Sequence, residues 1–324
     1  MLISYLIENI RKTPKELIIS KIIKKFPIIS WFLSYPEVFI KFPSKNLNIK
    51  INFFRLKFWT LLVNRVSTFN YIYKKSCDKN IQIYKSQESN IKSLMEASDL
   101  FEIITKAKIF GCSYLNDFLD IEEYSSLLNE FSDENFSLPS SKILFGSGVN
   151  CINKRISKKN LKIFDEKIRI ITKHLLGKNI SIKEIGMQRL ERVSKDINDS
   201  NTLQHIDRFI PAVKFFYFPK EVSKEQGPFG YVPFSHLIND KYIKSVKKGF
   251  LENNESPFSI PNPSDFNEVA LTVKANTFVV AFTNGIHRRI PFENKKNLKR
   301  DSCRFIFYDL FTRFDLIRFL FLKS

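Results

Sequence analysis

Three regions of the chain differ in how their apolar and polar residues alternate. Residues 1–95 contain apolar segments with helical spacing, divided by prolines. Residues 101–177 contain helical patterns after a short strand pattern, and residues 204–308 alternate short apolar runs with turn residues. We therefore predict a mostly helical N-terminal extension, residues 1–95, followed by a mainly β domain with flanking helices, residues 96–324.

Two helices are predicted ahead of the β-rich region. Asp120 and Glu123 have the spacing of a capping box. The apolar stripe of that first helix consists of Ile121, Tyr124, Leu128 and Phe131. The second helix is predicted by apolar residues at spacings of four, three and four, namely Phe164, Ile168, Ile171 and Leu175. His174 lies in its last turn, where the helix dipole favours an imidazole, so we assign it a structural role.

The predicted strands come from runs of aromatic and β-branched residues. Residues 212–218 (AVKFFYF) predict one strand, and RDSCRFIFYDL predicts another that begins at Arg300. Residues 180–193 predict a strand pair, and residues 269–282 predict a hairpin because a polar turn splits two apolar runs. Short strands that alternate with turns over this length are typical of a double-stranded β-helix, the jelly-roll or cupin-like core.

The composition is that of a folded protein and excludes several classes. Apolar residues make up 44% of the 324 positions, and only 9 glycines and 13 prolines occur, which excludes low-complexity disorder. The cysteines include no Cys-x-x-Cys pair, so neither a zinc knuckle nor a disulfide framework is indicated. No apolar run reaches the ~18 residues of a membrane span, and the N-terminus lacks the pattern of a secretory signal. We therefore predict a cytoplasmic protein.

The net charge of +19 is concentrated at the front of the chain. Residues 1–95 contain 17 Lys and Arg against 5 Asp and Glu, a net charge of +12, which leaves +7 for the rest. A basic amphipathic helix can lie on an anionic membrane or bind a partner. The simpler interpretation is a helical layer packed on the core with solvated lysines, and an AT-rich genome would also enrich lysine.

The candidate chemistry centres on His205, Asp207 and His287. Side chains two positions apart on a strand point to the same face, so His205 and Asp207 form a two-pronged ligand. One further imidazole from a distant strand would complete the two-histidine, one-carboxylate triad of non-haem Fe(II) oxygenases. In the structural alternative, Asp207 pairs with Arg208 or Arg289 and His287 caps a turn.

Several segments around these residues resemble one family, the phytanoyl-CoA dioxygenase-like iron(II)/2-oxoglutarate oxygenases. The matching segments are QHID, GPFGYVPFSH and KANTFVVAFTNGIHR, followed by an arginine shortly beyond the second histidine. The resemblance spans residues 101–308. The chain departs from the family pattern at Phe234, where the family usually has glycine, so the turn at this position is expected to differ. His236, at the end of the second segment, is expected to be structural.

The resemblance implies that His205, Asp207 and His287 hold Fe(II) and are the catalytic residues. It also implies that 2-oxoglutarate is the co-substrate and that an arginine grips its distal carboxylate through two hydrogen bonds. Arg300 is the first choice and Arg304 the competitor, since both share one side of a strand. Gln188 is a further candidate contact for the co-substrate.

The implied activity is hydroxylation of a C–H bond in a small or lipid-like substrate, with dioxygen consumed and succinate and carbon dioxide released. Lys214, Phe216 and Arg289 are candidates to line the pocket. One alternative is a non-catalytic jelly-roll binding protein whose basic front region contacts a membrane surface or polyanion. The other is a nucleic-acid-modifying oxygenase, motivated by the charge alone and less favoured.

Overall fold

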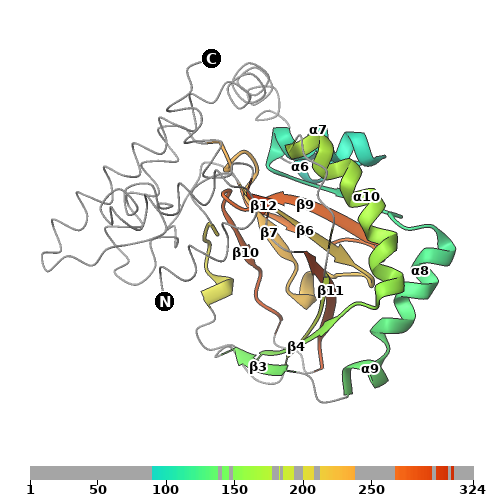
Figure 1. Ribbon diagram of the computed structural model, residues 1–324. Helices are drawn as coiled ribbons and strands as arrows, with labels where there is room; N and C mark the ends of the chain where they lie inside the picture. Colours follow the sequence, from blue (N-terminus) through green and yellow to red (C-terminus); the bar gives the residue numbers. More distant parts are fainter. Residues whose placement is uncertain are drawn as a thin grey trace, which may run out of the picture. The chain divides into compact units, whose positions relative to one another are not determined.

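Helices precede most of the strands in the part of the chain that the structure, a computed structural model, describes (Figure 1). The described residues are 90–137, 141–145, 149–176, 182, 185–192, 200–207, 212–237, 267–293, 297–305 and 308–309. The predicted helical extension lies outside them except for its last six positions, from Asn90 to Met95. All described residues belong to one compact unit.

A large sheet forms the centre of this unit. Every neighbouring pair in it is antiparallel except β1 and β2, which are parallel. In spatial order its strands are β1 (Glu96–Ala97), β2 (Cys112–Leu115), β9 (Thr277–Phe282), β6 (Ala212–Phe218), β11 (Lys299–Phe305), β5 (Ile185–Arg192), β4 (Val149–Arg155) and β3 (Ser141–Phe145), with β12 (Tyr308–Asp309) beside β6. The strand predicted for residues 212–218 is confirmed, and the one predicted from Arg300 begins at Lys299.

A second, smaller sheet contains β10 (His287–Arg289), β7 (Phe229–Tyr231) and β8 (Val269–Leu271) in that order. Two sheets with flanking helices confirm the predicted mainly β, jelly-roll fold class. The hairpin predicted for residues 269–282 is wrong, because β8 pairs with β7 in the small sheet whereas β9 pairs with β6 and β2 in the large one.

The connection between β8 and β9 is fixed by Asn276, which has a left-handed φ of 59°. Its side-chain oxygen accepts hydrogen bonds from the Leu119 amide (3.0 Å) and from the Tyr217 hydroxyl (2.9 Å), and its amide donates to the Leu119 carbonyl (2.7 Å). Asparagine tolerates this backbone conformation better than most residues. The polar turn therefore carries the chain from one sheet to the other instead of folding it back.

Helices cover one face of the large sheet (Figure 1). The capping box of Asp120 and Glu123 is confirmed at the start of α8. The apolar stripe predicted for this helix is wrong at Ile121, which is 84% exposed, whereas Leu127 is buried. The helices are α6 (Ile91–Met95), α7 (Leu100–Phe110), α8 (Ile121–Leu128), α9 (Asp133–Ser137) and α10 (Lys158–Leu176).

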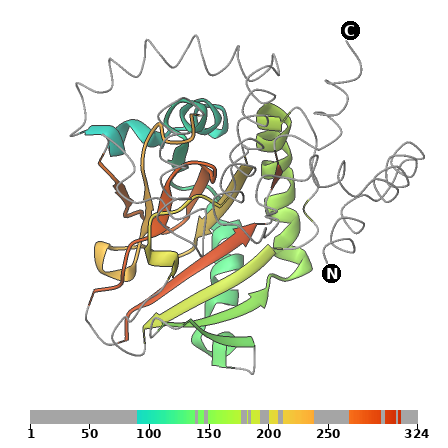
Figure 2. The same cartoon turned by 90° about the vertical axis from the view of Figure 1, so that its left-hand side faces the viewer.

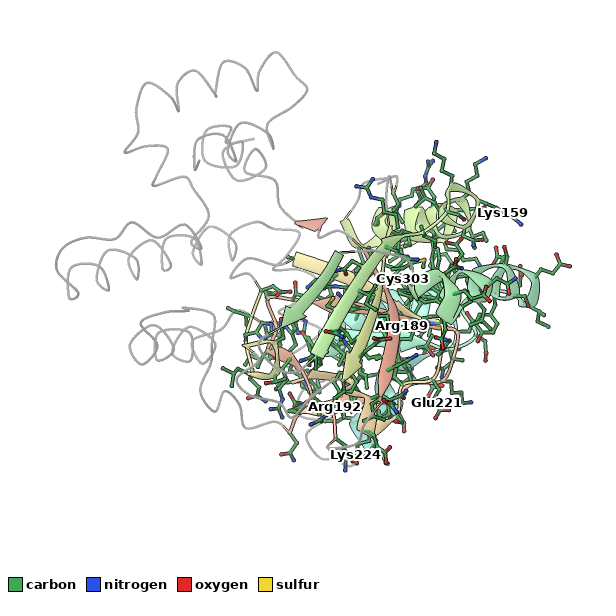
Figure 3. All side chains as sticks on the ribbon, turned by 90° about the horizontal axis from the view of Figure 1, so that it is seen from below. Lys159, Arg189, Arg192, Glu221, Lys224 and Cys303 are labelled. Carbon is green, nitrogen blue, oxygen red and sulfur yellow. The ribbon has the colours of Figure 1, made fainter. Side chains whose placement is uncertain are left out.

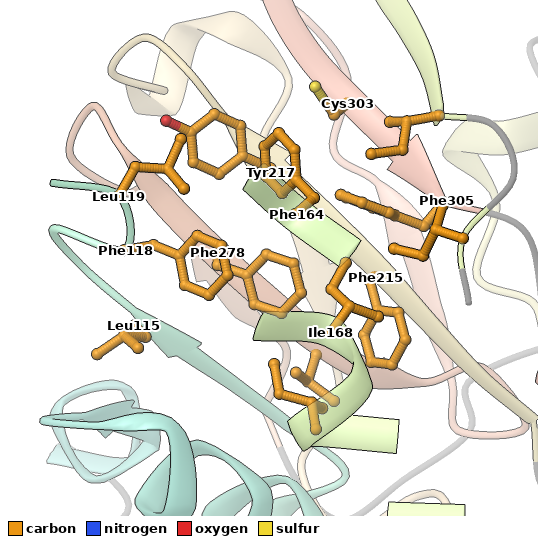
Figure 4. Close-up of a cluster of buried hydrophobic side chains, with 14 of the residues drawn as sticks. Leu115, Phe118, Leu119, Phe164, Ile168, Phe215, Tyr217, Phe278, Cys303 and Phe305 are labelled. Carbon is orange, nitrogen blue, oxygen red and sulfur yellow. The ribbon is translucent and has the colours of Figure 1, made fainter. Parts of the chain in front are cut away.

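The main core lies between these helices and the large sheet. Phe118 stacks on Phe278 with ring centroids 4.3 Å apart, and Phe164 of α10 meets Tyr217 edge-on at 5.1 Å (Figure 4). Burying one such side chain contributes roughly 1.5–3 kcal/mol. The predicted apolar stripe of α10 is buried as expected at Phe164, Ile168 and Ile171, although the helix begins earlier, at Lys158.

The side chains on the two faces of strands β5 and β11 have different surroundings. Residues 185–192 form one strand of the predicted pair, and the positions before Ile185 lie outside the described residues except for Ile182. This strand, β5, runs beside β11 (Figure 2), and Gln188 lies opposite Ser302. Odd-numbered residues of β5, β6 and β11 face the helices, which we call the helix-covered face. Even-numbered residues face a cavity, and we call this side the pocket face.

The turn at Phe234 keeps the backbone that a glycine would favour. Its φ is 64°, in the left-handed region, where bulky residues are rarely found. The ring is buried and lies 5.4 Å from that of Phe110, and the Phe234 amide donates to the Phe110 carbonyl (2.8 Å). Phe234 thus has a backbone conformation that glycine adopts more readily, and its ring is held by packing against Phe110.

Cys112, Cys151 and Cys303 are free and buried, and Cys77 lies outside the described residues. Among the helices that the structure describes, none combines the length and apolarity needed to cross a bilayer.

Candidate metal centre

Three predicted ligands, His205, Asp207 and His287, converge on one point. Their potential ligand atoms all lie within 4.8 Å of one another. The His287 Nε2 is 3.4 Å from Asp207 Oδ2, and the His205 Nε2 is 3.8 Å from Asp207 Oδ1. Ligands bonded at about 2.1 Å on one face of an octahedron lie about 3 Å apart, so small side-chain rotations complete the site.

Backbone pairing aligns the two histidines. His205 and His287 form an isolated antiparallel bridge in which each amide donates to the other's carbonyl at 2.9 Å. The Asp207 amide donates to the Thr283 carbonyl (2.8 Å), which fixes the carboxylate beside them. The prediction that His205 and Asp207 lie on a regular strand is wrong, since only a single bridge forms here. Ile206 is nevertheless buried, whereas His205 and Asp207 are half-buried and line a cavity.

The outer nitrogens of both imidazoles are held by backbone carbonyls. His205 Nδ1 lies 2.7 Å from the Leu203 carbonyl oxygen, and His287 Nδ1 lies 2.8 Å from the Gly285 carbonyl oxygen. A carbonyl can only accept, so each Nδ1 carries a proton, and each Nε2 is the ring atom that faces Asp207. Such contacts are the usual means of orienting metal-ligating histidines.

The charges of the site match a metal-binding state. Burial, reinforced by repulsion from His287, lowers the pKa of His205 to about 4, so this ring is neutral at neutral pH. Burial alone would raise the pKa of Asp207, but His287 and Lys214 hold it well below its usual range. A neutral imidazole and an ionised carboxylate are the protonation states that metal ligation requires.

Every other predicted site residue lines the same cavity of about 140 Å³. A single water needs only ~10–15 Å³, so this space holds a small molecule. The residues that we predicted and that line it are the triad, the three co-substrate candidates and the three pocket candidates: His205, Asp207, His287, Gln188, Arg300, Arg304, Lys214, Phe216 and Arg289. The structure therefore brings together residues that are separated by more than a hundred positions.

Arg300 is held at the pocket by the turn that precedes β7 of the small sheet. Its Nη1 donates to the Gly227 carbonyl, and its Nε is buried without a hydrogen-bond partner. Gly227 has a φ of 63°, and a Cβ there would approach the Ile290 carbonyl oxygen to 2.9 Å, so the turn requires glycine. Burial and the neighbouring guanidinium groups of Arg289 and Arg304 lower the pKa of Arg300 to about 9.

Gln188 is oriented on the pocket face by two side chains of β4. Its Nε2 lies 3.0 Å from the Cys151 Sγ and 3.2 Å from the Asn153 Oδ1. These contacts engage its amide nitrogen, so the side-chain oxygen remains the group with which it can meet a ligand.

One contact was missed in the sequence, the hydrogen bond of Lys214 Nζ to Asp207 Oδ2 at 3.0 Å. The available signal was a single lysine in the otherwise apolar strand AVKFFYF, since a buried lysine in a sheet needs an anionic partner. A second missed feature is the fork of Arg288 on Glu268, with three contacts of 2.7–2.9 Å. No pattern in the sequence links these two positions.

The two other described histidines, His174 and His236, were predicted to be structural, and neither belongs to the three clustered ligands. His236 is almost fully buried, its Nε2 lies 3.1 Å from the Lys108 carbonyl oxygen, and burial lowers its pKa to about 4. His174 lies in the last turn of α10, where its ring meets Phe101 edge-on at 5.1 Å. Neither residue lines the cavity.

Comparisons with known proteins gave structural matches only. A scan against protein-family models found no match, and neither did a search of curated proteins.

Three solved structures illustrate the structural matches. The epimerase SnoN, solved with Fe3+, alpha ketoglutarate and nogalamycin RO, is 15% identical over 65% of this chain and 83% of its own, with a TM-score of 0.47. AviO1 from Streptomyces viridochromogenes Tue57 is 15% identical over 66% of this chain and 96% of its own, with a TM-score of 0.43. HygX from Streptomyces hygroscopicus, solved with nickel and 2-oxoglutarate, is 14% identical over 62% of this chain and 84% of its own, with a TM-score of 0.42. Because these values are low, we base the functional conclusion on the site's own geometry.

Proposed function

We propose that this protein is an Fe(II)- and 2-oxoglutarate-dependent oxygenase of the phytanoyl-CoA dioxygenase-like kind, which hydroxylates a C–H bond of a small or lipid-like substrate. The observation that carries the proposal is the convergence of His205, Asp207 and His287 in a cavity that also contains Arg300. Two imidazoles and one carboxylate on one face of a metal leave the opposite positions open for co-substrate and dioxygen.

The donor set favours iron over structural zinc. No thiolate is among the three clustered ligands, and structural zinc sites are closed by four ligands, commonly including cysteine. When bound, iron would supply the activation of dioxygen that accompanies decarboxylation of 2-oxoglutarate to succinate and carbon dioxide. The protein's part is to position the reactants and to shield them from water.

In this proposal Arg300 binds the distal carboxylate of 2-oxoglutarate through both arms of its guanidinium group. Its Nε has no hydrogen-bond partner within the cavity wall, so a ligand oxygen would satisfy it. Gln188, on the adjacent strand of the same face, would contact the co-substrate through its side-chain oxygen. Lys214 would hold the Asp207 carboxylate in place.

The carboxylate at Asp207 favours hydroxylation over halogenation. A halogenase of this kind has a small residue at the corresponding position, which leaves room for a halide on the metal. Here the aspartate carboxylate occupies that position beside His287. We therefore expect oxygen rather than halide to be transferred to the substrate.

An anaerobic titration tests the proposal. Fe(II) and 2-oxoglutarate should together give the protein a weak visible charge-transfer band, and exposure to dioxygen should release succinate. His287→Ala should lose the band and weaken iron binding at least ~100-fold, since it removes one of three ligands. His174→Ala is the matched control, because that imidazole is exposed and remote from the cavity. A wild-type protein that binds no iron, or a His287→Ala variant with an unchanged band, would contradict the assignment.

We further propose a two-part organisation, with a basic extension at residues 1–95 and the oxygenase domain at residues 96–324. Contact of the extension with a membrane surface and a cytoplasmic setting both remain predictions. Salt-dependent binding of the full chain to anionic vesicles, compared with neutral vesicles, would test the first of these.

A further inference from the structure

The carboxylate of Glu268 bonds to the side chains next to both candidate metal-ligand histidines. Gln204, which precedes His205, donates from Nε2 to Glu268 Oε1 at 3.4 Å. Arg288, which follows His287, donates from Nε to both carboxylate oxygens at 2.9 Å and from Nη2 to Oε2 at 2.7 Å. One carboxylate thus joins two histidine-bearing segments that lie far apart in the sequence.

The small sheet leaves room for this carboxylate at Gly230. That glycine lies in β7, opposite Arg288 of β10 on one side and Ala270 of β8 on the other. Glu268 directly precedes β8, and a Cβ at Gly230 would approach Glu268 Cδ and Oε1 to 2.8 Å. Because the middle strand has no side chain at this position, the carboxylate can reach across it to Arg288.

The ion pair between Glu268 and Arg288 is partly buried and also holds the backbone ahead of His205. The Glu268 side chain is 13% exposed and that of Arg288 is 31% exposed. Arg288 Nη1 donates to the carbonyl of Thr202 at 3.3 Å, at the end of the short helix η3 (Ser200–Thr202). Partial burial and two-pronged geometry distinguish this pair from a screened surface contact.

We propose that Glu268 is a positioning residue for the metal centre, which sets the distance between the His205 and His287 segments through Gln204 and Arg288. The His205 segment belongs to no regular strand and meets His287 through a single backbone bridge, so side-chain contacts are needed to fix it further. Glu268 is not among the described residues that line the cavity, so it acts through its two partners. This inference rests on the proposed function and adds a residue to the same site.

Metal binding by the full chain tests this role without substrate or co-substrate. Fe(II) and, separately, Co(II) are titrated calorimetrically into the anaerobic protein, and the visible bands of bound Co(II) are recorded at saturation. Glu268→Gln should weaken binding of both ions about 10- to 100-fold and shift the Co(II) bands, because the ligands lose their support. A purely structural ion pair would lower the melting temperature and change neither reading.

Glu123→Gln is the matched control, since it breaks a 2.8 Å ion pair with Lys167 in the helical layer, away from the cavity. It should lower the melting temperature and leave the metal affinity and the Co(II) bands as in wild type. Arg288→Lys is the second variant. It keeps the positive charge without the fork, so it should also weaken metal binding.

The double variant Glu268→Gln/Arg288→Lys should bind metal no more weakly than the weaker single variant, because both changes break one contact. Fully additive losses, or wild-type metal affinity and Co(II) bands in Glu268→Gln, would overturn the positioning role alone. If Glu268→Gln does not fold, the same criterion applied to Arg288→Lys decides. A wild-type protein that binds neither ion would contradict the proposed function and this inference together.

Discussion

The two faces of strands β5 and β11 differ in the partners that they offer to a buried arginine. On the helix-covered face, Arg189 is 1% exposed and its guanidinium group is surrounded by acceptors. On the pocket face, Arg300 donates to one backbone carbonyl and meets no carboxylate among the described residues. The two faces of this strand pair thus carry one arginine whose donors are bound by carboxylates, Arg189, and one without a carboxylate partner among the described residues, Arg300.

The paired arginine is part of a closed ionic network. Arg189 Nε and Nη2 fork onto the Asp301 carboxylate at 2.6 and 2.8 Å, and Nη1 donates to Asp133 at 2.6 Å. Lys220 reaches Asp301 at 3.0 Å, and the guanidinium carbon of Arg189 lies 4.2 Å from the ring centroid of Phe136 (Figure 3 labels Arg189 among the strands). This network joins β5, β11 and the helical layer.

The pKa values of the two arginines are shifted in opposite directions. Burial tends to lower the pKa of Arg189, but Asp301 and Asp133 raise it above its usual value. The pKa of Arg300 is lowered to about 9, because burial is reinforced by Arg289 and Arg304. A paired buried charge is complete within the fold, whereas an unpaired one is stabilised when a ligand supplies the missing anion. The contrast separates structural charge from binding charge.

The sharpest test of this contrast removes the carboxylate on the helix-covered face. Asp301→Ala should reduce the free energy of unfolding by about 3–5 kcal/mol, because among the described residues it leaves the buried Arg189 with one carboxylate partner, the exposed Asp133. Urea unfolding followed by circular dichroism measures the effect.

The double variant Asp301→Leu/Arg189→Met is the control, since it removes both charges and keeps apolar volume. It should regain most of the lost stability. A single variant as stable as wild type would show that the network contributes little.

Removing Arg300, on the pocket face, should weaken ligand binding and leave stability almost unchanged. Arg300→Gln should change the free energy of unfolding by less than about 1 kcal/mol, since no ion pair is lost, and weaken 2-oxoglutarate binding by about 2–3 kcal/mol, or roughly 30- to 150-fold. Calorimetric titration of 2-oxoglutarate into the anaerobic Fe(II) protein gives the affinity. Arg300→Lys keeps the charge without the fork and should lie between the two. Unchanged affinity in Arg300→Gln would assign the co-substrate to Arg304.

The smallest effect is expected at the exposed edge of the network. Asp133 is 73% exposed at its side chain although it contacts Arg189 and Lys299. Solvent and salt screen such a pair, so Asp133→Asn should lower the melting temperature far less than Asp301→Ala does. Adding salt should reduce even this difference. A decrease as large as that of Asp301→Ala would mean that both carboxylates share the buried charge equally.

The candidate site residues could be predicted because their residue types and spacing are visible in short segments of the sequence. The spacing of His205 and Asp207, the second histidine at 287 and the arginine beyond it can all be found in the sequence, since ligand chemistry restricts residue types. Strand β6 and the capping box of α8 were predictable for a similar reason, because propensity and side-chain hydrogen bonds act within a few residues.

Other features depended on contacts that a sequence does not display. The apolar runs on either side of Asn276 have the pattern of a hairpin, yet they belong to different sheets, because the asparagine side chain is bonded to Leu119 and Tyr217, far away in the chain. The exposure of Ile121 and the backbone of Phe234 were likewise set by neighbouring elements.

By itself, then, the sequence determined the mainly β fold class, the three candidate ligands and the candidate arginines. Only the tertiary structure decided which arginine is paired, because the charges of Arg189 and Asp301 meet across two strands that lie more than a hundred residues apart. It also decided that Lys214 contacts Asp207 and that His205 pairs with His287 through their backbones. Electrostatic partners are chosen by distance in space, and folding alone sets that distance.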